Sequence, residues 1–236
     1  MNKFLFLFGI FFLVFSCKKT KHEKAYTITD KKSLEKLFQL KNYKNQEKIK
    51  INDSTIHIKA DNGRFFLEGN MNSKLNERTG IWSLTNKTNL QKIEIDYIAF
   101  GKKDVHRNQI LFFNDKGILD SLTSKFYISE IKNDKNKKYL ELKFFSTRNP
   151  KERFAKASVH YSIIRDHKEI MIDSISLKDG NGRYKTKVDF DFKPKDRISG
   201  YFSEFTTSQI EDDSRKIGDS VTIAIGNSTI YFREKL

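Results

Sequence analysis

Apolar and polar residues alternate along most of the chain after residue 48. Ile49 and Ile51 lie before the segment Asn52-Asp53-Ser54, and Ile56 and Ile58 lie after it. A period of two predicts strands that bury one face, and the segment between them has the residue types of a hairpin turn. The same alternation predicts further strands at residues 63–68, 79–84, 92–100, 109–113, 118–127, 139–145, 158–165, 169–177, 187–192, 198–205, 220–225 and 229–233.

A helical period occurs once, near the start of the chain. Leu34, Leu37 and Phe38 share one helical face, and Asp30 can cap the helix. A single short N-terminal helix and about a dozen strands predict an all-β fold of antiparallel sheets, either a sandwich or stacked meanders. Residues 30–131 and 132–236 are then two β-rich regions, or one continuous domain.

The first 16 residues read as an export signal. Lys3 supplies a positive charge, and an apolar run from Phe4 to Phe15 follows it. About a dozen apolar residues are too few to span a bilayer as a helix but suit the core of a signal peptide. We therefore expect residues 1–16 to be removed on export.

The end of that run resembles the lipobox of bacterial lipoproteins in Val14-Phe15-Ser16-Cys17. The resemblance implies that Cys17 becomes the first mature residue and is acylated, with palmitate among its acyl chains. Cys17 is the only cysteine, so an internal disulfide cannot form. Residues 17–29 are expected to be a basic tether. Lys18 and Lys19 after the cysteine favour the outer membrane, with the protein facing the periplasm rather than the cell surface.

The net charge is +15, a value that often indicates nucleic-acid binding. Residues 17–50 hold about half of the excess, in a stretch expected to lie near the membrane. No helix-turn-helix or ribonucleoprotein motif occurs in the sequence. The lipobox resemblance implies attachment to a membrane through lipid, and the charge distribution with the missing motifs argues against nucleic acid. An envelope protein or a glycan is a further expected partner.

Two segments resemble the MORN-variant repeats of antitoxin-like lipoproteins. Asn76-Glu77-Arg78-Thr79-Gly80-Ile81-Trp82 matches the basic turn before Gly-x-Trp, and residues 111–118 match the aromatic strand before Asp-x-Gly. The resemblance implies stacked β-hairpins and a binding or structural module. A reading from the residues alone makes Gly80 a turn residue, Trp82 a core anchor and Asp115-Lys116-Gly117 a hairpin turn.

The sequence contains no recognisable catalytic, metal or cofactor motif. Its histidines lack metal-ligand spacing, and we expect them to lie on the surface: His22, His57, His106, His160 and His167. A Gly-x-Ser-x-Gly elbow and a glycine-rich phosphate loop are both missing. Two pairs of carboxylates could act together as acid and base: Glu94 with Asp96, and Asp189 with Asp191. Alternating carboxylates are also typical of the solvent-exposed face of a strand.

Four Asp-Ser triplets end in an aliphatic residue or threonine, a pattern at which some bacteria attach O-glycans to exported proteins. The candidate serines are Ser54, Ser121, Ser174 and Ser220. Asp and Ser are also common in turns, and an aliphatic residue often begins the strand that follows. The same triplets can therefore be turn residues without a glycan.

These observations favour a membrane-anchored envelope lipoprotein that acts as a binding or structural module without catalysis. An envelope glycan hydrolase is the first alternative, and an immunity or antitoxin-like protein is the second.

Overall fold

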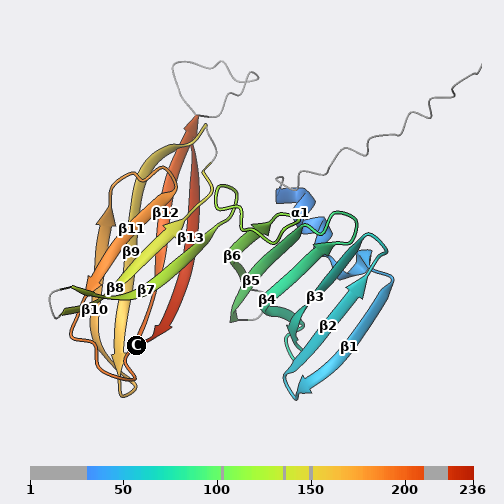
Figure 1. Cartoon of the computed structure of the whole chain (residues 1–236), viewed down its shortest axis with the longest axis horizontal. Helices are drawn as coiled ribbons and strands as arrows, with labels where there is room; N and C mark the ends of the chain where they lie inside the picture. The colour runs from blue at the N-terminus through green and yellow to red at the C-terminus, as the bar shows by residue number, and fades with distance from the viewer. Residues whose placement is uncertain (1–30, 102–103, 135–136, 149–150, 210–222) are drawn as a thin grey trace, which may run out of the picture.

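The computed structural model describes residues 31–101, 104–134, 137–148, 151–209 and 223–236, and forms two lobes that lie side by side (Figure 1). The first lobe is a six-stranded antiparallel meander, here called sheet A, in which every strand pairs with its neighbour in sequence. Its strands are β1 (Asn45–Asn52), β2 (Thr55–Asp61), β3 (Phe65–Asn72), β4 (Glu77–Asn86), β5 (Lys92–Gly101) and β6 (Asp104–Phe113).

The second lobe is a sandwich of two antiparallel sheets. The four-stranded sheet has the order β10-β9-β12-β13, and the three-stranded sheet has the order β11-β8-β7. Its strands are β7 (Phe126–Asp134), β8 (Lys137–Phe145), β9 (Arg153–Arg165), β10 (Lys168–Leu177), β11 (Arg183–Asp189), β12 (Arg197–Gln209) and β13 (Ile223–Lys235). The predicted all-β antiparallel class with one short helix is confirmed.

One face of sheet A is covered by the N-terminal helix α1 (Lys31–Leu37) and the 3-10 turn η1 (Leu40–Asn42). Leu34 and Phe38 are buried against the sheet, as their helical spacing predicts, and Tyr43 follows them into the same core. The predicted cap, Asp30, lies outside the described residues. Sheet A therefore has one apolar face under the helix and one face that no helix of the described residues covers.

Trp82 is the centre of that core. Its side chain is fully buried, its indole Nε1 donates to the Asn70 carbonyl at 2.7 Å, and its ring lies over Gly69 on the neighbouring strand. The Arg78 guanidinium lies 4.9 Å from the ring and donates to the Phe38 carbonyl, which joins the helix end to the sheet. Trp82 is thus the core anchor that the sequence predicts.

The sandwich buries a second apolar core between its two sheets. Leu142, Phe144 and Phe202 are fully buried, and the Phe144 and Phe202 rings stack at 4.7 Å. Alternation along β12 explains the arrangement, because Ile198 and Phe202 face this core while Ser199 and Tyr201 face outward. The outer face of the four-stranded sheet is therefore free of a covering layer within the described chain.

Three predicted strands take a different form. Residues 118–127 form two isolated bridges and a turn before β7 begins at Phe126. The Asp120 carboxylate makes the turn, because it accepts from the Leu122 amide at 3.0 Å and the Thr123 hydroxyl at 2.8 Å. The strands predicted at 220–225 and 229–233 are one strand, β13, because it pairs with β12 without a break from Ile223 to Lys235.

Other turns agree with the sequence. Asn52-Asp53-Ser54 joins β1 to β2, and Asn181 and Gly182 adopt positive φ angles of 50° and 78° before β11. Gly117 also has a positive φ, of 73°, in the turn after Phe113. Gly80, expected in a turn, instead lies within β4 at a break in register with β3, where its φ of 64° suits glycine.

Two buried carboxylates of the second lobe, Glu204 and Glu141, are paired with cationic side chains. Glu204 is buried and accepts from Arg148 and from the Tyr184 hydroxyl, the latter at 2.6 Å. On the outer face of the three-stranded sheet, Lys185 and two further lysines surround the Glu141 carboxylate and lower its pKa to about 2.

Replacing Gly69 with alanine should lower the free energy of unfolding by about 1–3 kcal/mol, because overpacking a core has a cost of that order. The new Cβ would lie 2.3 Å from an atom of the Trp82 ring. Gly101→Ala is the matched control, since no atom lies within 4 Å of its added Cβ. Denaturant unfolding of both variants measures the difference. Equal stability of the two would show that the ring does not press on Gly69.

Candidate functional site

A β-bulge in β6 joins the two lobes. Asp96 pairs with Gln109 and Tyr97 pairs with Arg107, so Asn108 has no partner on β5. Bulges redirect a side chain, and here the Asn108 side chain points toward β13, an edge strand. Its amide donates to the Tyr231 carbonyl at 3.0 Å and accepts from the Tyr231 amide at 2.6 Å. The Asn108 side chain therefore forms the two main-chain hydrogen bonds that a neighbouring strand would otherwise form at Tyr231.

Lys125 and His106 strengthen the same junction. Lys125 donates to the carbonyls of Arg107 at 3.0 Å and Thr229 at 3.1 Å, and so connects β6 to β13. His106 Nε2 lies 3.2 Å from the same Thr229 carbonyl. Burial lowers the pKa of His106, and the positive charge of Lys125 lowers it further, so the imidazole is neutral at pH 7.

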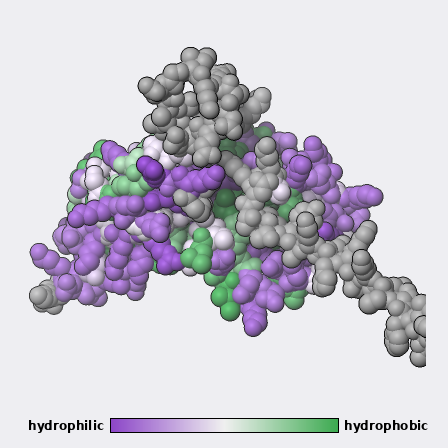
Figure 2. Space-filling view, turned by 90° about the horizontal axis from the view of Figure 1, so that it is seen from above, coloured by the Kyte–Doolittle hydropathy of each residue, from purple (hydrophilic) through white to green (hydrophobic). Residues whose placement is uncertain are grey.

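A cleft of about 980 Å³ lies beside this junction. Sheet A lines it at β5 and β6 through residues that include Asp96, Phe100 and Gln109. The four-stranded sheet lines most of the rest, and Tyr127 of β7 also contributes. Figure 2 shows hydrophobic residues gathered near the middle of the molecule between hydrophilic flanks. The cleft is thus built from both lobes.

A row of rings crosses the strands of the four-stranded sheet. Tyr231, Tyr201 and His160 are cross-strand partners on β13, β12 and β9, and Ser174 on β10 ends the row. Ring centroids are 5.9 Å apart for the two tyrosines and 4.9 Å apart for Tyr201 and His160. Phe100 of sheet A extends the row, with its ring 4.8 Å from Tyr231.

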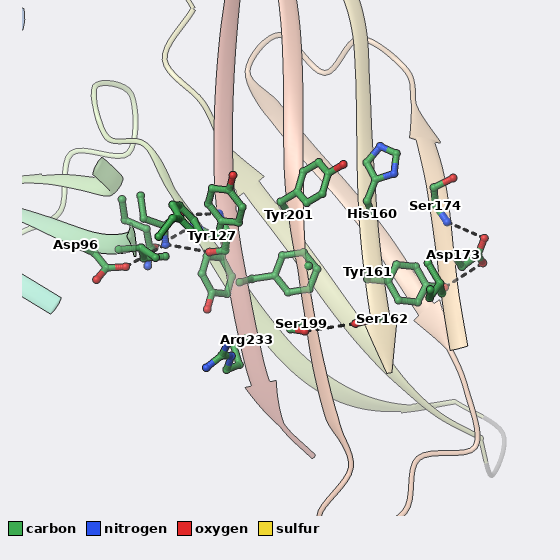
Figure 3. Close-up of a pocket in the computed structure, with 18 residues that line it drawn as sticks. Asp96, Tyr127, His160, Tyr161, Ser162, Asp173, Ser174, Ser199, Tyr201 and Arg233 are labelled. Carbon is green, nitrogen blue, oxygen red and sulfur yellow. Dashed lines mark hydrogen bonds between the residues drawn. The ribbon is translucent and has the colours of Figure 1, made fainter. Parts of the chain in front are cut away.

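A second row runs parallel to the first and is displaced from it by two residues on each strand. It consists of Arg233, Ser199, Ser162 and Ile172. Figure 3 shows the Tyr201 and His160 rings on one side of the Ser199–Ser162 pair, whose hydroxyl oxygens are 3.5 Å apart. Among the described residues, neither the Arg233 guanidinium nor the Tyr201 and Tyr231 hydroxyls form an ion pair or hydrogen bond. Several polar groups in the cleft are thus available to a ligand.

The carboxylates singled out in the sequence are not gathered into one site. Glu94 forms an ion pair with Lys92 at 2.6 Å, and Asp96 accepts from the Asn108 amide at 3.0 Å. Asp189 and Asp191 are exposed in the sandwich and do not line the cleft. Only Asp96 of the four lines it.

The histidines, all expected on the surface, lie in different environments. His57 lies 2.9 Å from the Asn70 side chain on sheet A, and His167 occupies the β9–β10 turn with a φ of 64°. His106 belongs to the junction. His160, expected on the surface, is half-buried within β9 and lines the cleft. His22 lies outside the described residues. No group of three or more His, Cys, Asp and Glu side chains in the described chain could hold a metal ion.

Sequence reasoning missed the ring row itself. Tyr201 and Tyr231 each lie in the outward phase of their strands, and neither was singled out in the sequence. The signal was available, because buried Phe202 and Phe232 directly follow them and therefore fix the opposite face.

The candidate glycosylation serines lie in different settings. Ser54 is in the β1–β2 turn, where its hydroxyl donates to Asn52, and Ser121 is in the Asp120 turn. Ser174 is exposed within β10 and lines the cleft. Ser220 lies outside the described residues, as do the export signal at 1–16, Cys17 and the tether at 17–29. O-glycosylation of these serines stays a prediction.

Within the described ranges, no helix combines the length and hydrophobicity needed to cross a bilayer. Comparisons of the chain with protein-family models, curated proteins and solved structures gave no match.

The junction should depend on the Asn108 amide. Asn108→Leu keeps the side-chain size but leaves the Tyr231 amide and carbonyl without these partners, which should lower the free energy of unfolding by about 2 kcal/mol. Asn133→Leu, at an exposed position on β7, is the control. Denaturant unfolding measures the loss, and small-angle X-ray scattering should show a larger radius of gyration for Asn108→Leu alone. Unchanged stability and radius would mean that other contacts hold the lobes together.

Proposed function

We propose that this protein is a lipid-anchored cell-envelope protein that binds a neutral glycan in the cleft without catalysis. The observation that supports this function is the pairing of a ring row with a row of serines along one exposed sheet face. Sugars combine hydroxyl rims with apolar C–H faces. A lining that mixes hydroxyls with aromatic and aliphatic groups therefore matches their chemistry.

The strand pairing favours a glycan over a peptide. Peptides that bind sheets usually extend an edge and form main-chain hydrogen bonds. Here β9 and β12 are paired on both sides, so this part of the face offers side-chain groups instead. The hydroxyls of Ser162, Ser199 and Tyr201 suit the hydroxyl and amide groups of N-acetylated sugars.

The charge of the cleft supports a neutral ligand. Asp96, Asp173 and Arg233 are its charged lining residues, and neither sign dominates. The Asp173 carboxylate is already occupied, since it accepts from the Tyr161 hydroxyl at 3.2 Å and from the Ser174 amide at 2.7 Å. A strongly acidic or basic polymer would lack matching partners.

Attachment to the membrane rests on the lipobox resemblance at Cys17. Two or three acyl chains on this residue would give stable anchoring. The lysines that follow favour an outer-membrane location facing the periplasm, where envelope glycans are accessible.

Cys17→Ser should abolish acylation and release the protein from the membrane fraction. Growth with an alkyne analogue of palmitate labels the acylated protein, and the label can be assigned because the chain has one cysteine. Ser16→Ala, which keeps a small residue before the cysteine, should retain both the label and the membrane location. A Cys17→Ser protein that still fractionates with membranes would contradict lipid anchoring.

The full-length protein in detergent should bind N-acetylglucosamine hexamer in calorimetry and should sediment with purified peptidoglycan. Tyr201→Ala should weaken hexamer binding about tenfold, or about 1.4 kcal/mol, since tyrosines in binding surfaces often contribute this much. Tyr139→Ala is the matched control, because Tyr139 lies on the outer face of β8, remote from the cleft.

Two results would contradict the proposal. Failure of the wild-type protein to bind both the hexamer and peptidoglycan would exclude glycan binding of this class. Release of shorter oligomers over time would show a hydrolase instead.

A further inference from the structure

We infer that the cleft binds a linear glycan by one chain end, over about three sugar residues that lie across the strands. The inference rests on the proposed function and specifies how the same cleft selects its ligand.

A trough crosses the four-stranded sheet at the second row. Ser199 and Ser162 are small and half-buried, and the Tyr201 and His160 rings rise beside them on one side. On the other side, the next row places Arg197 opposite Ile164. The small side chains on β12 and β9 leave a channel between the two flanking rows, with Arg233 of β13 at one end and Ile172 of β10 at the other.

The width of the sheet sets the length of this channel. Four strands are separated by three spacings of about 4.8 Å, which gives about 14 Å from β13 to β10. An extended chain of about three pyranose residues fits this span, with one sugar beside each interstrand step.

Sheet A closes the channel at β13. Phe100 and Ile98 project from β5 into the cleft, and Phe100 remains 52% exposed although it contacts Tyr231. Asp96 and Arg233 lie at the same end and supply an acceptor and donors for a terminal sugar. A chain that continued past β13 would collide with β5.

The opposite end of the channel is open. β10 is the edge strand of its sheet, and Ile172 at the end of the serine row is 74% exposed. The rest of a longer glycan can leave the protein there. The cleft thus recognises an end and tolerates any length beyond it.

A ladder of N-acetylglucosamine oligomers tests this geometry with the full-length protein. Affinity should rise at least tenfold from one sugar to three and then stay constant to six, because sugars beyond the third leave the sheet. Oligomers blocked by a bulky group at one terminus should lose at least tenfold in affinity, and those blocked at the other terminus should bind normally.

Two variants and one control locate the contacts that determine affinity and end recognition. Ser199→Phe should fill the trough and weaken trimer binding at least tenfold, whereas Ser176→Phe, an exposed position of β10 outside the cleft lining, should not. Phe100→Ala should open the closed end and let oligomers blocked at either terminus bind equally.

The outcomes separate the two proposals. Affinity that keeps rising to the hexamer, or indifference to blocking either terminus, would overturn end recognition and leave glycan binding intact. No binding by any oligomer or by peptidoglycan would overturn both.

Discussion

The arrangement of this protein depends on the side chain of one bulged residue. Asn108 forms two hydrogen bonds with the main chain of Tyr231, and this contact fixes sheet A against the edge of the sandwich. An unpaired strand edge exposes amides and carbonyls that otherwise bind water or another chain. By pairing with this edge, Asn108 both protects it and places β5 beside the outer face of β13. The cleft is the space that this placement leaves.

The two lobes bury the apolar faces of their sheets in different ways. Sheet A covers one face with a short helix and keeps the other for polar groups and the cleft, while the sandwich covers each inner face with the other sheet. The outer face of the four-stranded sheet is therefore free for a row of rings and a row of serines. Because strand partners fix which residues align, these rows follow directly from the register of β9, β12 and β13.

Much of the fold could be predicted because its signals are local. Alternation identified most strands, helical spacing identified Leu34 and Phe38, and Trp82 was expected in the core. The prediction was wrong at 118–127, where the Asp120 side chain binds the backbone and so favours a turn over a strand. The cleft was beyond local reasoning, because it depends on register between distant strands. One sign of the junction is present in the sequence: four successive polar residues, His106-Arg107-Asn108-Gln109, break the alternation where the bulge occurs.

The order of strand pairing has a consequence for folding kinetics. Every pair in sheet A joins strands adjacent in sequence, so only short loops must close. The sandwich, in contrast, must bring β9 to β12 across residues 166–196, a closure with a greater entropic cost. We therefore expect sheet A to form first and to present Asn108 before the last strand of the chain, β13, reaches it. The early lobe would then serve as a template that selects the position at which the late edge docks.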